Sequence, residues 1–274
     1  MNPNESAALS ALKASKNYAD ICPDTVERVF LEQLPKYKKL KDAEKSARSQ
    51  LHAITGAFIT NEELSRARAA FDRWREGEPG ALREVLLCHA STRERVDEAD
   101  ALFDRVFDVC ENPKVVLDLA CGFNPIYLGA RGSVSVTGAD IHGGCVRFVN
   151  DCARACGWPV CARLGDLLSE IPTDACDLAL MMKLLPVLEN QKSGAAIRLL
   201  GSVRARFILV TFPTRTLGGR GIGMERHYSE WFEALRPENA EIIDRFATAN
   251  ELAYVLKTNN FTHSERTQPC RNYT

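Results

Sequence analysis

Three residues in the middle of the chain have types and positions that suit the binding of a nucleoside. Gly122, Asp140 and Asp166 each come shortly after an expected β-strand. In an open parallel sheet the carboxyl ends of the strands meet at one edge, and ligands bind beyond that edge. A carboxylate there accepts hydrogen bonds, so Asp140 suits a ribose diol and Asp166 suits an adenine amino group. The pattern therefore predicts a site for an adenosine ligand.

The loop that contains Gly122 argues against a ligand with phosphates. Its sequence, "ACGFNP", contains one glycine. Dinucleotide-binding loops have the pattern G-x-G-x-x-G, and phosphate-binding loops of NTPases have G-x-x-x-x-G-K-[ST]. Neither pattern fits this loop. An adenosine ligand that lacks phosphates fits better, and we therefore predict S-adenosylmethionine as the cofactor.

The sequence around these residues predicts an α/β fold. From residue 115 onward, short apolar strands alternate with helical segments, which is typical of a doubly wound, mostly parallel sheet. The last two strands lie close enough in sequence to form an antiparallel hairpin at the sheet edge. The expected strands are residues 115–119, 134–139, 160–164, 177–182, 207–212, 241–247 and 251–256.

The residues before this sheet read as helices. Pro23 suits the first position of a helix whose apolar face includes Val26 and Val29. Further along, Ser91 and Glu94 have the spacing of a capping box, which predicts that a helix begins at Ser91.

One of these helices carries a row of basic side chains. Residues 36–52 contain six Lys or Arg and two Asp or Glu, a local net charge of +4. Lys41, Lys45, Arg48 and His52 fall on one stripe at helical spacing, beside an apolar stripe. Such a row can be a solvated helix face, or it can dock on nucleic-acid phosphates. The row alone does not decide between these interpretations.

Composition limits the remaining possibilities. The 274 residues have a formal net charge of −1, so a nucleic-acid surface must come from local clustering of charge. No apolar run is long enough for a membrane span or a signal peptide, and we expect a cytoplasmic protein. The ten cysteines include no Cys-x-x-Cys pair, so we expect reduced thiols and no metal. The candidate metal cluster is Cys145, Cys152, Cys156 and Cys161.

Seven longer segments stand out along the chain: "LHAITGAF", "HASTRER", "DLACGFNP", "ADIH", "MMKLLPVLE", "TFPTRTLGGRGIGMERHY" and "ELAYVLK". Together they resemble one enzyme family, the aminoglycoside-resistance 16S ribosomal RNA (guanine(1405)-N7)-methyltransferases. The resemblance runs from about Lys13 to Lys257, with motifs in family order. It implies a class I S-adenosylmethionine-dependent methyltransferase fold with a Rossmann-like, seven-stranded sheet.

The resemblance also implies a division of the chain and a substrate. An all-helical RNA-binding domain would occupy residues 1–110, the catalytic domain 111–257 and a disordered tail 258–274. The enzyme would methylate N7 of guanine 1405 in the assembled 30S subunit and confer resistance to kanamycin- and gentamicin-type drugs. No obligate protein partner is implied.

The resemblance assigns roles to individual residues. Arg95 would hold the carboxylate of the cofactor, and Lys183 would line the methyl-transfer pocket. The other cofactor-binding residues would be Thr92, Ala120, Gly122, Asp140, Ile141, Asp166, Leu167 and Gln191. The residues that contact ribosomal RNA would be Lys45, Arg48, His52, Arg215, Arg220, Met224 and Glu225. Phe123 stands where the family more usually has leucine, and the tail after Lys257 is longer than usual.

The chemistry requires few catalytic groups. Guanine N7 has an in-plane lone pair and no proton, so its methylation needs orientation and no general base. An ammonium beside N7 would oppose the positive charge that develops there, and Lys183 is therefore expected to contact guanine O6 or a phosphate. The alternatives are a small-molecule methyltransferase, a non-catalytic RNA-binding or ribosome-assembly protein, and the sibling family that methylates N1 of an adenine.

Overall fold

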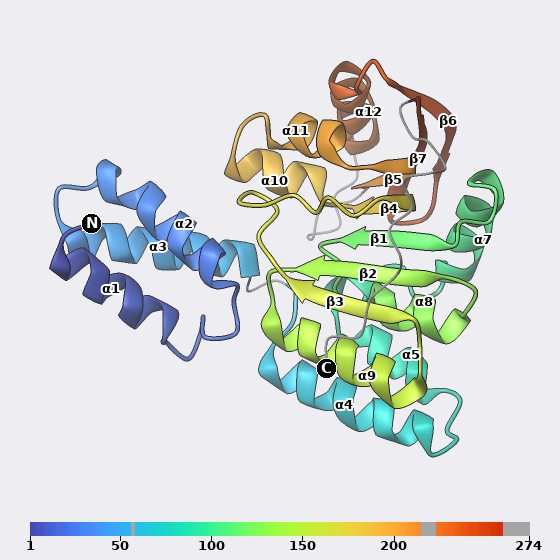
Figure 1. The fold of residues 1–274 in the computed structure, drawn as a ribbon, viewed down its shortest axis with the longest axis horizontal. Helices are drawn as coiled ribbons and strands as arrows, with labels where there is room; N and C mark the ends of the chain where they lie inside the picture. Colours follow the sequence, from blue (N-terminus) through green and yellow to red (C-terminus); the bar gives the residue numbers. More distant parts are fainter. Residues whose placement is uncertain (56–57, 215–222, 260–274) are drawn as a thin grey trace.

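The computed structural model describes residues 1–55, 58–214 and 223–259, and within these ranges it contains a seven-stranded sheet (Figure 1). The strand order is β3-β2-β1-β4-β5-β7-β6; the first five strands are parallel, and β7 is antiparallel to β5 and β6. This arrangement confirms the expected fold class. The strands are β1 (Val115–Leu119), β2 (Ser135–Asp140), β3 (Val160–Leu164), β4 (Cys176–Met182), β5 (Ala205–Pro213), β6 (Ala240–Ala247) and β7 (Glu251–Thr258).

Alternation along the strands produces two apolar faces. Val116 of β1 packs in one buried cluster and the next residue, Leu117, packs in another, because successive side chains of a strand point to opposite faces. Helices α8 (Asn124–Arg131) and α9 (Gly143–Cys156) cover the first face. The second face is covered by α10 (Leu185–Gln191), α11 (Ala195–Ser202) and α12 (Met224–Leu235).

The helices before the sheet fall into two groups by their packing. Helices α1 (Pro3–Lys13), α2 (Pro23–Gln33) and α3 (Leu40–Thr55), with the 3₁₀ turn η1 (Leu34–Lys36), share a separate buried cluster. We call residues 3–55 the N-terminal module. Helices α4 (Asn61–Arg75), α5 (Ala81–Leu87) and α7 (Ala99–Val109) contribute side chains to the cluster on the first face of the sheet. The division at residue 110 stays a prediction, but buried contacts group the helices after residue 60 with the sheet.

The N-terminal module lies on the side toward which the parallel strands point. In Figure 1 the arrowheads of β1, β2 and β3 are directed at α1–α3. The carboxyl edge of the sheet, where the sequence predicts a ligand, therefore faces the module. Val26, Val29 and Phe30 of α2 are fully buried within it, which confirms the helix expected from Pro23.

The helix start expected at Ser91 is wrong. His89 caps the short helix α6 (Ala90–Arg93) instead, because its ring nitrogen accepts the N–H of Ser91. The chain leaves this helix at Glu94, and α7 begins five residues later. The break lets the next side chain, Arg95, turn into the interior, where it is 4% exposed.

Candidate cofactor and RNA sites

The loop after β1 has a strained backbone that brings it against its neighbours. Ala120 and Gly122 have φ angles of +58° and +50°, a region that side chains with a Cβ rarely adopt. A Cβ added at Gly122 would lie 2.5 Å from the His89 ring, so glycine is required there. The loop is held to the next strand because Cys121 N–H donates to the carbonyl of Ala139.

Asp140 lies at the end of β2 and fixes this loop. Its Oδ2 accepts the N–H of Gly122 at 2.9 Å, and its Oδ1 accepts the N–H of His142 at 2.8 Å. Desolvation raises the pKa of Asp140 above its ordinary value, although these two backbone donors oppose the shift. A carboxylate has about four lone-pair positions, so the group has capacity left for a diol such as a ribose.

Asp166 lies beyond β3 and has a partner from the N-terminal module. Its Oδ1 accepts the N–H of Leu168 at 2.9 Å, and its Oδ2 accepts Nε of Arg28 at 2.8 Å. Arg28 also donates from Nη2 to Oε1 of Gln191 at 3.0 Å. The structure thus brings together Asp166, expected at the adenine, and Gln191, expected at the cofactor, and it adds Arg28, which the sequence analysis did not predict.

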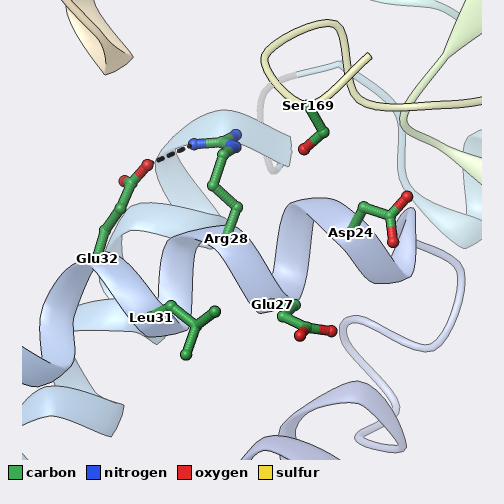
Figure 2. Close-up of a pocket in the computed structure, with 6 residues that line it drawn as sticks. All are labelled: Asp24, Glu27, Arg28, Leu31, Glu32 and Ser169. Carbon is green, nitrogen blue, oxygen red and sulfur yellow. Dashed lines mark hydrogen bonds and ion pairs between the residues drawn. The ribbon is translucent and has the colours of Figure 1, made fainter.

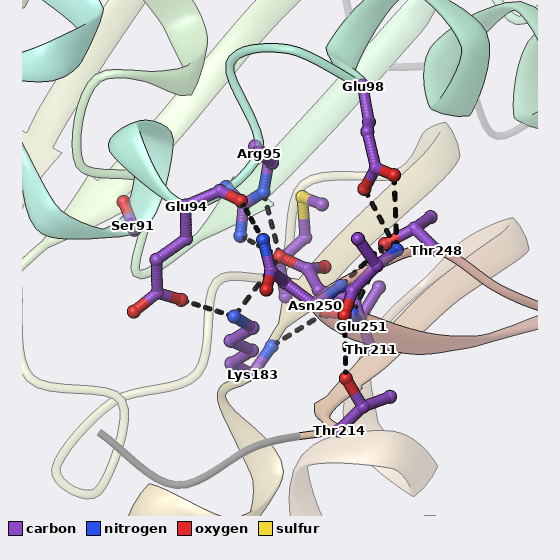
Figure 3. Close-up of polar contacts among 12 residues, drawn as sticks. Ser91, Glu94, Arg95, Glu98, Lys183, Thr211, Thr214, Thr248, Asn250 and Glu251 are labelled. Atoms are coloured by element: carbon purple, nitrogen blue, oxygen red, sulfur yellow. Dashed lines mark hydrogen bonds and ion pairs between the residues drawn. The ribbon is translucent and has the colours of Figure 1, made fainter. Parts of the chain in front are cut away.

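Arg95 is buried in a polar cluster at the end of the sheet (Figure 3). It donates from Nη1 to Asn124 at 2.9 Å and from Nε to Glu251 at 3.0 Å. Its Nη2 lies 2.9 Å from Glu251 Oε1 as an ion pair but makes no hydrogen bond of good geometry. This buried Nη2 is a donor of the kind that a cofactor carboxylate would satisfy.

Lys183 directly follows β4 and has a left-handed conformation, with φ of +55°. Its N–H donates to the carbonyl of Thr211, and its ammonium forms ion pairs with Glu94 and, at 3.5 Å, with Glu251 (Figure 3). Burial alone would raise the pKa of Glu251, but the charges of Arg95 and Lys183 lower it below its ordinary value. Glu251 is therefore the shared anion of two cations expected in the site.

Asp118 is a further buried acid beside this cluster. It lies within β1, is fully buried, and has its pKa raised well above the ordinary value by burial, against the opposing influence of Arg95 and Asn124. A neutral carboxyl at this position avoids an uncompensated negative charge in the interior.

The other residues expected at the cofactor lie along the same edge, with local bonds of their own. The buried hydroxyl of Thr92 donates to the carbonyl of Leu86. Ile141 accepts the N–H of Cys22 at its carbonyl, at 2.7 Å. Leu167 is buried in the cluster on the second face of the sheet. Their contacts with a cofactor stay predictions.

The residues expected to contact RNA lie on two elements. Lys45, Arg48 and His52 are exposed on α3, and among the described residues no ion pair involves them. Met224 and Glu225 begin α12, where Met224 is partly buried and Glu225 lies 3.6 Å from Arg245. Arg215 and Arg220 lie outside the described residues.

Sequence reasoning missed several residues of these clusters. Arg28 lies on the polar side of an amphipathic helix and has no local signal. Glu94, Asn124 and Glu251 lie inside the motifs "HASTRER", "DLACGFNP" and "ELAYVLK". Glu251 could have been found from the sequence, because it is an acidic residue at the start of an otherwise apolar strand.

Cys145 and Cys152 are buried on α9, and the part of the chain that the structure describes holds no group of three or more potential metal ligands. None of its helices is both long and apolar enough to span a bilayer.

Comparison with known proteins identifies the family. The model of the family described as "Ribosomal RNA methyltransferase (FmrO)" matches residues 14–255. A relative from Serratia marcescens named "16S rRNA (guanine(1405)-N(7))-methyltransferase" is 44% identical over 259 residues, which cover 94% of this chain and 100% of the relative. A relative from Micromonospora echinospora with the same name is 32% identical and covers 90% of this chain and 94% of its own length.

Solved structures agree with this match. The 16S rRNA methyltransferase RmtF, solved in complex with S-adenosyl-L-homocysteine, has a TM-score of 0.88 and 54% identity, and covers 94% of this chain and 99% of its own. The 16S rRNA methylase RmtB has a TM-score of 0.84 and 40% identity, with coverage of 94% and 100%. The chain therefore belongs to the FmrO family of ribosomal RNA methyltransferases.

Proposed function

We propose that this chain transfers a methyl group from S-adenosylmethionine to N7 of guanine 1405 in 16S ribosomal RNA, and that it acts on the assembled 30S subunit in the cytoplasm without a further protein partner. The observation that carries the proposal is the carboxyl edge of the sheet. It presents two acidic acceptors, Asp140 and Asp166, and it faces a helical module whose basic row has no ion pair with any residue that the structure describes. The names of the full-length relatives specify the base and the atom.

The residues at this edge fit S-adenosylmethionine by their hydrogen-bonding types. Asp140 would accept the ribose hydroxyls, and Asp166 with Leu167 would bind the adenine. Arg95 would bind the carboxylate through its buried Nη2. The bound cofactor supplies an electrophilic methyl group on a sulfonium.

The protein's contribution is orientation and exclusion of water. Because N7 has a free lone pair, the nucleotide needs to be lifted from its helix and aligned, which costs a few kcal/mol in lost stacking. Lys183 would lie at this pocket with its charge balanced by Glu94 and Glu251. That balance limits the repulsion between its ammonium and the guanine that becomes positive, and leaves Lys183 to contact O6 or a phosphate.

RNA affinity would come from the two elements that carry the expected contacts. Lys45, Arg48 and His52 of α3 would lie on the phosphate backbone. Arg215 and Arg220, together with Met224 and Glu225 at the start of α12, would contact the target nucleotide. Methylation of N7 would then prevent kanamycin- and gentamicin-type drugs from binding the decoding site.

The test is to map the modified base. Purified chain and labelled cofactor are incubated with intact 30S particles and, separately, with protein-free 16S RNA, and the RNA is analysed by primer extension and mass mapping. We expect wild type to form one N7-methylguanine, at position 1405, in 30S particles. In reactions with Asp140→Ala, the level of this modified base should be at least tenfold lower. Unmarked particles would support a non-catalytic RNA-binding protein, and a methyl group on an adenine N1 would support the sibling family; either result would contradict the proposal.

A further inference from the structure

We propose that Arg28 is a positioning residue for the adenine of the cofactor, and that the N-terminal module completes the cofactor pocket through it. The inference rests on the proposed function, because it takes S-adenosylmethionine as the ligand. It assigns to α2 a role in cofactor recognition that is separate from the RNA contacts expected on α3.

Arg28 bridges the module and two residues expected at the cofactor, Asp166 and Gln191, the first of them expected at the adenine. It donates to Asp166 at 2.8 Å and to Gln191 at 3.0 Å, and pairs with Glu32 of its own helix at 3.3 Å. The Arg28 side chain is 14% exposed and that of Asp166 is 3% exposed. A guanidinium is a planar fork of donors, so one side chain can fix both acceptors at once.

The outer side of Arg28 is a hollow between α2 and the segment after β3 (Figure 2). Figure 2 shows Arg28 reaching across from α2, with Glu32 on one side and Ser169 opposite. Arg28 is therefore at a junction between two parts of the molecule and not within the core of either. An arginine in that position, held by acceptors on both sides, connects the module to the ligand edge of the sheet.

Backbone bonds hold the start of α2 against the same edge. Cys22 N–H donates to the carbonyl of Ile141 at 2.7 Å, and Gly143 N–H donates to the carbonyl of Asp20 at 2.6 Å. A Cβ on Gly143 would lie 3.0 Å from that carbonyl, so the approach is close. The chain that leads into α2 therefore runs beside Ile141, itself expected to contact the cofactor.

Arg28 affects recognition by fixing the acceptors of Asp166. A nearly buried carboxylate without a cation nearby is unfavourable, and its side chain would turn toward water. With Arg28 on Oδ2 and the N–H of Leu168 on Oδ1, the carboxylate has one orientation and still has lone pairs for another donor. The 6-amino group of adenine is such a donor, whereas hypoxanthine has a carbonyl at that position.

This chemistry gives a test that a purely structural role would not satisfy. Calorimetry would compare S-adenosylhomocysteine with S-inosylhomocysteine, in which the amino group is replaced by a carbonyl. A hydrogen bond to a charged acceptor is worth roughly tenfold to a hundredfold in affinity, so wild type should prefer the adenosyl ligand by about that ratio. In Arg28→Gln we expect the ratio to fall to about threefold or less, with most of the loss in binding of the adenosyl ligand.

Arg68→Gln is the matched control. Arg68 also reaches from a helix before the sheet to an aspartate of the sheet domain, with Nη1 3.0 Å from Oδ2 of Asp151, but it lies away from the ligand edge. It should keep the wild-type ratio. Arg28→Lys retains the charge without the fork, and we expect an intermediate ratio; it decides the question if Arg28→Gln does not fold.

The outcomes separate this inference from the proposed function. If wild type binds neither ligand, the proposed function fails first. If wild type discriminates and both Arg28 variants keep its ratio, Arg28 has no positioning role and the inference is overturned. An equal loss of affinity for both ligands would also overturn it, because it would indicate a general structural effect.

Discussion

Helix α3 of the N-terminal module and the helices that pack on the sheet are both rich in basic residues but use them differently. In the helices that pack on the sheet, most arginines have carboxylate partners: Arg73 pairs with Glu84, Arg83 with Asp97, and Arg105 with Asp244. In the N-terminal module, Lys45 and Arg48 of α3 have no ion pair among the described residues. Sequence shows a basic helix in both cases, and only the fold distinguishes charges that are already neutralised from charges available for phosphate.

In the interior of the sheet domain, a basic side chain depends most strongly on its carboxylate partner. Arg95 and Glu251 are 4% and 0% exposed, so their charges depend on one another. A buried pair of this kind contributes little net stability when intact, but leaves an uncompensated charge when one partner is removed. Breaking pairs at increasing exposure should therefore give decreasing losses.

The largest expected effect is on folding, from Arg95→Gln. This substitution leaves Glu251 with only the more distant Lys183, and we expect the free energy of unfolding to fall by about 3–5 kcal/mol. Urea denaturation followed by circular dichroism measures it. The double variant Arg95→Gln/Glu251→Gln removes both charges and should recover part of the loss. A loss below about 1 kcal/mol in the single variant would show that the pair is not the electrostatic centre of the site.

The next effect is on RNA binding, from reversing two charges of the basic row on α3. Lys45→Glu/Arg48→Glu should weaken binding to 30S particles by about tenfold to a hundredfold and reduce the slope of log affinity against log salt by about two. Affinity for S-adenosylmethionine, measured by calorimetry, should not change, since neither side chain contacts the cofactor edge. Filter binding at several salt concentrations gives both the affinity for 30S particles and its dependence on salt.

Arg105→Ala is the control for this prediction. Arg105 donates two hydrogen bonds to Asp244, both at 2.8 Å, and is half exposed. Its loss should cost about 0.2–1 kcal/mol of stability, because solvent screens the pair, and should leave 30S affinity within about twofold. If Arg105→Ala weakens 30S binding as much as the α3 double variant does, the presence of a carboxylate partner does not determine which basic side chains bind RNA.

The fold was predictable because its signals are local. Each expected strand matches the observed one to within two residues, since buried parallel strands are apolar runs bounded by loops. The proximity of Gly122 and Asp140 was also predictable, because β1 and β2 are parallel neighbours and their carboxyl ends lie at the same edge of the sheet.

The missing parts of the site depend on contacts between distant segments. Arg28 and Asp166 are separated by 138 residues, and Arg95 and Glu251 by 156. A polar residue on a helix gives no indication of which acceptor it will meet, since docking of whole elements decides that. The wrong helix start at Ser91 has a similar cause: Thr92 and Arg95 take partners outside the helix, and His89 takes over the cap.

His89 shows a third state of a basic side chain. It is neither paired nor exposed: burial first, and then the nearby charges of His142, Arg95 and Arg93, lower its pKa to about 3. The folded protein keeps the ring neutral where the unfolded chain, with a pKa near 6.5, binds a proton. Stability from this group is therefore complete above about pH 6.5 and is lost as the pH falls toward 3, by at most about 1.4 kcal/mol per pH unit.

The measurement is urea denaturation of wild type and His89→Asn between pH 6.5 and 4.5. Asparagine keeps a side-chain acceptor for the cap of α6 and does not titrate, so the variant should lose less stability than wild type over this range. The difference between the two slopes isolates the proton taken up by His89 in the unfolded chain. Equal slopes would mean that His89 is protonated in the folded protein, which would place a third cation beside Arg93 and Arg95 and contradict the account of how this cluster balances its charges.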